Sequence, residues 1–132
     1  MITPEYVAGI CLYKALGGAQ RNIYRGVAPN EVSSFPYTVY TPIFNNRTHD
    51  KDYTETLTNI TYEVRIYGRN PTQVEEEANR LKEAHGMTRS AMEGDVVIGK
   101  ASIIYDNEYD GFDQTTLLFT KVMDFKVRAY VS

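Results

Sequence analysis

The period of the hydrophobic pattern changes near the middle of the chain. Over residues 57–68 apolar and polar side chains alternate, which is typical of a strand with one buried face. From Pro71 onward the apolar residues Val74, Ala78 and Leu81 recur at spacings of four and three, which is the period of an amphipathic helix. The sequence therefore predicts a strand that leads directly into a helix lying on the sheet.

Capping residues mark the start of this central helix. Asn70 can act as its N-cap, Pro71 suits its first position, and Gln73 stands where its side chain can reach the N–H of the cap. Gly86 can end the helix. We expect its charged side chains to point away from the core; these are Glu75, Glu76, Glu77, Arg80, Lys82 and Glu83.

The same signals predict a helix near the N-terminus. Thr3 can cap it, Pro4 and Glu5 suit its first turn, and the glycine pair at 17–18 ends it. Cys11 lies among the apolar residues of this helix and is the only cysteine, which excludes an intramolecular disulfide. Its surroundings favour a small buried side chain over a nucleophile.

Further extended segments flank the central pair. Residues 22–25 form a short one, and residues 35–42, bounded by prolines, form a strand near a sheet edge. A connector over residues 87–95 leads into an apolar strand over residues 96–105, in which Gly99 marks a bulge or a close approach.

The last strand, residues 117–131, is predicted to be long and half-buried. Lys121 interrupts its apolar phase, so we expect either a bulge there or a strand whose first part extends beyond the core. If this strand pairs with the central one, Lys126 or Arg128 can face Glu63 on the solvated side.

A polar segment at residues 44–56 is the candidate interface. Its mixed charge and low apolar content predict a protruding loop or hairpin, and segments of this length often carry function. The alternative is a loop without a partner. The candidate contact residues are Phe44, Arg47, His49, Asp50, Lys51, Asp52 and Tyr53.

Size and composition describe one ordinary domain over residues 1–132. No apolar run approaches the roughly 18 residues that a membrane span needs, and the N-terminus does not resemble a signal peptide, so a cytoplasmic origin is the default. The net charge of −3 gives no basic surface for wrapping nucleic acid. Eleven tyrosines suit partly solvated contact surfaces, as in an assembly protein.

The best metal candidate is the acidic segment Asp106 to Asp113. Asp106, Glu108 and Asp110 stand at alternate positions before Gly111, as in the first half of a calcium loop. The twelfth position of that loop is Leu117 instead of a carboxylate, and strands flank it. A solvated β-turn is therefore the preferred interpretation, and no metal or cofactor is predicted.

No set of residues in the sequence indicates catalysis. His49 lies in the polar segment and His85 at the end of the central helix, where it can favour the helix dipole. Neither has a nucleophile nearby in sequence, and motifs for nucleotide or metal binding are lacking. We expect no enzyme activity and no catalytic residue.

The chain resembles the tail-terminator and head-to-tail joining proteins of long-tailed bacteriophages. The residues that carry the resemblance are FPYTVYTP, the block ITYEVRIYGRNPTQVEEEANRLKEA and the closing FTKVMDFKVRAYV. The resemblance implies an α/β fold of the α+β kind, in which two helices pack on one face of a mainly antiparallel sheet of four to five strands.

The resemblance also implies a structural role in the virion. Such proteins form a ring, typically of six copies, at the head-proximal end of the tail, after assembly in the host cytoplasm. The ring would cap the tail tube protein and present a surface to the head connector protein, while DNA passes through its bore without sequence-specific binding. A mildly acidic subunit suits a bore through which DNA slides.

Two alternatives stay open. A phage head-completion or connector component would have the same composition and differ in its axial partner. A small ligand-binding α/β module would instead need a concave pocket with converging polar groups.

Overall fold

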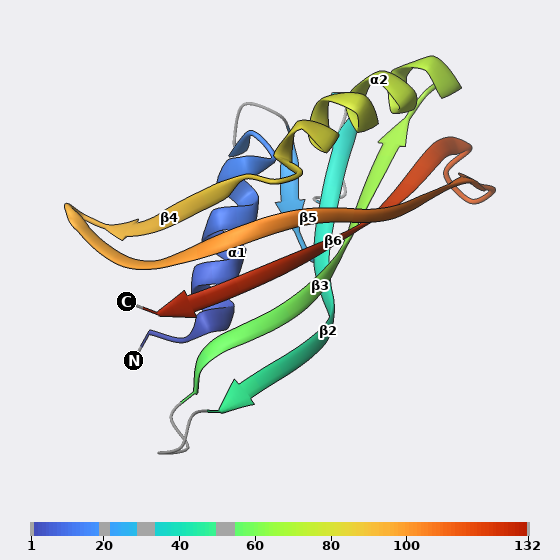
Figure 1. The fold of residues 1–132 in the computed structure, drawn as a ribbon. Coiled ribbons are helices and arrows are strands. Elements are labelled where there is room, and N and C mark those ends of the chain that lie inside the picture. Colours follow the sequence, from blue (N-terminus) through green and yellow to red (C-terminus); the bar gives the residue numbers. More distant parts are fainter. Residues whose placement is uncertain (1, 19–21, 29–33, 50–54, 132) are drawn as a thin grey trace.

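The fold is a curled sheet with helices along it (Figure 1). A computed structural model describes residues 2–18, 22–28, 34–49 and 55–131, with the side chains of 44–49 and 55–57 left out of the description. The elements are α1 (Pro4–Ala15), β1 (Ile23–Arg25), β2 (Tyr37–His49), β3 (Glu55–Gly68), α2 (Pro71–Leu81), the 3₁₀ turn η2 (Lys82–Ala84), β4 (Thr88–Glu93), β5 (Val96–Asp113) and β6 (Leu118–Val131).

The sheet has six strands in the order β1-β2-β3-β6-β5-β4. β1 and β2 run parallel, and every other neighbouring pair is antiparallel. The predicted α+β class and the mainly antiparallel sheet are confirmed. The predicted four to five strands are too few, because the connector at 87–95 contains β4.

Both helices pack on the same face of this sheet. On β3, Tyr62 and Gly68 lie on the same face because their positions differ by an even number. A Cβ on Gly9 of α1 would lie 3.7 Å from the Tyr62 hydroxyl, and a Cβ on Gly68 would lie 2.6 Å from Val74 of α2. The core therefore lies between this face and the two helices. Its largest fully buried side chains are Tyr62, Phe125, Leu12, Ile66, Leu81, Ile103, Met123 and Val7.

The predicted helix caps are present, with one change of partner. The Thr3 side chain accepts from the Tyr6 N–H at 3.2 Å, and Asn70 accepts from the Gln73 N–H at 2.8 Å. The Gln73 Oε1 accepts from the N–H of Arg69 instead of that of Asn70. Its Nε2 donates to the carbonyl of Phe35, so this residue also fastens α2 to the segment before β2.

One predicted solvent-facing charge of α2 is instead buried. Glu77 is only 5% exposed and lies beside the apolar stripe, paired with Arg80 at 3.4 Å. Helical spacing explains the difference, because residue 77 is one turn from both Val74 and Leu81.

Two segments predicted as irregular are strand. Residues 88–93 form β4, which turns at Gly94 with a φ of 63° and pairs with β5. The acidic segment predicted as a β-turn belongs to β5, which continues for 18 residues to Asp113. Residues 88–93 are polar because β4 is an edge strand. The acids at the end of β5 are polar because they pair with lysines.

Gly99 is both a bulge neighbour and a point of close approach. The register shifts from the pair Ala91 and Gly99 to the pair Met92 and Val97, so Ile98 is the extra residue. A Cβ on Gly99 would lie 2.5 Å from the carbonyl oxygen of Tyr130 and 2.6 Å from Val7. The predicted close approach is therefore confirmed at Gly99, and the bulge lies at the neighbouring Ile98.

The predictions for Lys121 and for the charge facing Glu63 are wrong. β3 and β6 pair without a register shift from Leu57 to Gly68, and Lys121 stays in phase with the core at 5% exposure. The irregularity lies on β5, between Tyr105 and Asn107. The same register places Asp124, and not Lys126 or Arg128, opposite Glu63.

β2 lies one strand inside the edge of the sheet. It runs through Pro42, where its register shifts, and continues to His49. β1 pairs only with Thr38 to Tyr40, so no described strand pairs with that side of β2 beyond Tyr40. Among the described helices, none is long and apolar enough to span a membrane.

Candidate functional site

The candidate interface lies on the β2–β3 hairpin, at the end of the sheet opposite α2 (Figure 1). The arms pair from Asn45 with Ile60 to His49 with Glu55. Residues 45–49 and 55–56 are therefore strand, as in the hairpin alternative of the prediction. Residues 50–54 lie outside the described residues.

The seven candidate contact residues divide into two groups. Phe44, Arg47 and His49 lie on β2, and their side chains are outside the description. The other four lie outside the described residues: Asp50, Lys51, Asp52 and Tyr53. Their role as contacts stays a prediction.

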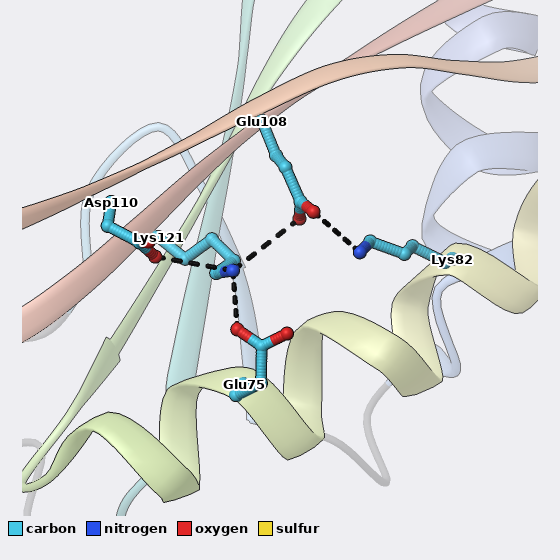
Figure 2. Close-up of polar contacts among 5 residues, drawn as sticks. All are labelled: Glu75, Lys82, Glu108, Asp110 and Lys121. Atoms are coloured by element: carbon cyan, nitrogen blue, oxygen red, sulfur yellow. Dashed lines mark hydrogen bonds and ion pairs between the residues drawn. The ribbon is translucent and has the colours of Figure 1, made fainter.

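A cluster of charged side chains lies beneath α2, at the opposite end of the sheet (Figure 2). Lys121 is its centre, with Nζ distances of 2.5 Å to Glu75, 3.2 Å to Asp110 and 3.7 Å to Glu108. Lys82 binds the other oxygen of Glu108 at 2.6 Å. We call these five residues the Lys121 cluster.

Four elements bring the Lys121 cluster together. Asp110 of β5 lies directly opposite Lys121 of β6, and Glu108 shares its face because strand side chains alternate. Glu75 and Lys82 are seven residues apart on α2 and η2, so they project from the same side of this helical segment, about two turns apart.

The carboxylates keep the buried ammonium group charged. The Lys121 side chain is 6% exposed, and burial alone would lower its pKa. Hydrogen bonds to Glu75 and Asp110, with the charge of Glu108, outweigh burial and raise that pKa. Burial acts to raise the pKa of Glu108, but Lys82 and Lys121 together lower it.

A concavity of about 550 Å³ opens beside the Lys121 cluster, between the start of α2, the end of β5 and the start of β6. Its polar rim includes Glu75, Glu76 and Asp110, and its apolar wall includes Val74 and Phe119. Carboxylates favour a cationic guest over an anionic one. The other lining residues are Pro71, Thr72, Gly111 and Thr120.

The acidic segment does not form the predicted turn or a calcium loop. Glu108 and Asp110 are engaged with Lys121, and Asp106 lies 3.6 Å from Lys126 on the neighbouring strand. Over residues 2–18, 22–28, 34–49 and 55–131, no group of three or more His, Cys, Asp or Glu residues is placed to hold a metal ion.

Cys11 and His85 have structural partners. Cys11 is fully buried, as predicted; its thiol donates to the carbonyl of Arg89 at 3.4 Å, and burial raises its pKa. His85 follows η2, and its Nδ1 accepts from the N–H of Tyr105 at 3.0 Å. This contact fastens the end of the helical segment to β5.

Three arginines have local partners. Arg65 pairs with Glu63 at 3.1 Å, Arg69 lies 4.6 Å from the centre of the Phe35 ring, and Arg89 donates to the sulfur of Met87. The Lys121 cluster was not predicted as a unit. The only signals for it are a lysine in an apolar phase and acids at alternate positions of β5.

No protein-family model matches this chain, and no curated protein is similar to it in sequence.

Proposed function

We propose that this chain is a structural virion assembly protein, a tail terminator that forms a ring, caps the tail tube and joins it to the head connector. The observation that carries the proposal is the β2–β3 hairpin. Its arms remain paired well past Tyr40, where the pairing of β1 with β2 ends. A paired hairpin of polar sequence gives a stiff arm suited to contacting another subunit or the tube.

The face of the sheet without helices offers a second contact surface. Tyr109, Val122, Arg65 and Val39 form one row across four strands of this face. Tyr109 is 53% exposed, and aromatic and arginine side chains are common at protein interfaces. A ring needs two different complementary patches on each subunit, and the hairpin and this face are separate surfaces.

The overall charge agrees with a ring around DNA. A net charge of −3 per subunit provides no strong attraction for phosphates, so DNA would slide through the bore. In this proposal six copies stand at the head-proximal end of the tail, between tube protein and connector protein.

The proposal is tested by deleting the gene in its source phage and measuring tail lengths by negative-stain electron microscopy. Overlong tubes without heads, beside free heads, are the result expected for a terminator. Tails of normal length beside free heads would favour a head-completion or joining component. Intact virions would refute a role in the virion.

The concavity beside the Lys121 cluster favours one other candidate function, a small ligand-binding module. Its acidic rim and apolar wall suit an organic cation. A thermal-shift screen with amines separates the two functions, since saturating binding raises the melting temperature by several degrees. No shift with any cation would leave the assembly role as the better explanation.

A further inference from the structure

The outer edge of β4 ends the sheet on the side away from β1 (Figure 1). The N–H of Ile103 donates to the carbonyl of Met87 at 2.9 Å, so alternate residues from Met87 onward bond to β5. The backbone groups of the residues between them, Thr88, Ser90 and Met92, point outward. No described strand pairs with this edge.

The edge lacks the proline, lysine and strand bulge that often prevent pairing. Natural edge strands are blocked by proline, lysine or a bulge. β4 reads TRSAME, without proline or lysine, and the extra residue of the β4–β5 bulge is Ile98 on β5. This edge is therefore open to another strand.

The charges along β4 are self-complementary. Arg89 and Glu93 lie on the same face of the strand, two positions either side of Ala91, and both are exposed. No described acid lies within ion-pair distance of Arg89, and no described base within that distance of Glu93. In an antiparallel pair centred on Ala91, each arginine stands opposite a glutamate.

We propose that β4 pairs antiparallel with β4 of a second copy of this chain, around a twofold axis at Ala91. Ser90 then lies opposite Met92 of the second copy, and both present outward N–H and C=O groups, so the two residues exchange hydrogen bonds. Arg89 lies opposite Glu93 of the second copy, and the symmetry repeats both pairs.

Charge and the length of β4 select this register over its neighbours. A shift of two residues toward the start of β4 places Arg89 opposite Ala91 and Glu93 opposite Met87, so neither charge is compensated. A shift in the other direction places Arg89 opposite Asp95, but Asp95 lies beyond the end of β4 at Glu93 and so outside a strand pair. Opposite charges at facing positions stabilise a strand pair, and like charges destabilise it.

The contact is small, so the dimer should be weak. Six residues a side bury less than a standard interface, although the exposed Met92 and Val97 beside the edge add apolar area. We expect a monomer at about 10 µM and a dimer at several hundred micromolar, at low salt.

Sedimentation equilibrium of the full chain tests the pairing. Arg89→Glu and Glu93→Arg each place like charges opposite one another and are expected to weaken dimerisation at least about tenfold. The double variant Arg89→Glu/Glu93→Arg restores opposite charges and should restore wild-type association. Arg128→Glu makes the same charge change as Arg89→Glu at an exposed position of β6; it is the control and should leave this dimerisation unchanged.

A monomer at all concentrations would overturn the proposal, and so would a double variant as weak as the single ones. Circular dichroism checks folding. If a variant unfolds, amide exchange of the wild type decides instead: protection of Ser90 and Met92 must rise with concentration. The test of the β4 dimer is separate from the test of the proposed ring. A ring would appear as a larger species, and the charge changes on β4 would not alter it.

Discussion

Lys121 shows how one residue can keep a charge inside an apolar phase. Its position on β6 shares one face of the strand with the buried Met123 and Phe125, yet its ammonium group meets carboxylates from α2 and β5. Buried ion pairs of this kind often contribute little net stability, because desolvation offsets the attraction. The aliphatic stem still fills space beneath α2.

Substitutions of Lys121 can separate packing from charge. Lys121→Met keeps most of the stem, and Glu75 and Asp110 are 52% and 80% exposed, so water can solvate them. We expect Lys121→Met to lower the free energy of unfolding by less than about 1.5 kcal/mol and Lys121→Ala to lower it by about 3 kcal/mol. Urea unfolding followed by circular dichroism measures both. Equal losses would mean that the charge, and not the stem, dominates.

Asp124 is a residue whose ionisation opposes folding. Burial raises its pKa, and the charges of Glu63 and Asp106 raise it further. Folding therefore favours the protonated form of Asp124. The stabilisation from protonation is complete below the pKa of Asp124 in the unfolded chain, and it is lost as the pH rises through the pKa of Asp124 in the folded protein. Asp124→Asn should add about 0.5 kcal/mol at pH 7.

That gain should disappear below about pH 3.9, the ordinary pKa of aspartate. Urea unfolding at pH 7 and pH 3 provides the comparison. Glu83→Gln, at an exposed position of η2, is the control and should change stability by less than about 0.5 kcal/mol at either pH. A gain that persists at pH 3 would contradict the electrostatic explanation.

At the scale of elements, α1 approaches β5 so closely that one glycine is required. Gly99→Ala would place a methyl group against the Tyr130 carbonyl and Val7, so we expect a loss of about 2 to 3 kcal/mol. Gly9→Ala on α1 meets only ordinary contacts at 3.7 Å and should gain about 0.5 to 1 kcal/mol from helix propensity. Thermal unfolding of both variants checks the contrast; a neutral Gly99→Ala would refute the close approach.

Elements with a strong hydrophobic period were predictable, and elements held by charge or by an edge were not. β3 and α2 follow from the periods of two and 3.6 with capping residues. β4 was missed because Ala91 is its only fully buried side chain, which leaves no alternation. The sequence predicts a turn for the end of β5 because the acids there resemble solvated turn residues. In the structure they face Lys121 and Lys82, a contact between elements that spacing within one segment does not reveal.

At the scale of the whole molecule, the body and the hairpin depend on different contacts. β3 remains paired with β6 from Leu57 to Gly68, whether or not β2 continues past Asn45. The hairpin arms beyond that point can therefore be removed without breaking the centre of the sheet. This separation makes the proposed assembly role testable apart from stability.

Replacing residues 46–54 by a short Gly-Ser turn should leave the fold intact and abolish tail or head joining. Circular dichroism and a melting temperature within a few degrees of the wild type check the fold, because closing a shorter loop changes stability little. A Gly-Ser insertion in the β4–β5 turn at Gly94 and Asp95 is the matched control, since it changes another hairpin and should leave joining unaffected. If the folded, shortened protein still supports infectious particles, the hairpin is not part of the interface. The tail-terminator proposal would then lose the observation that carries it.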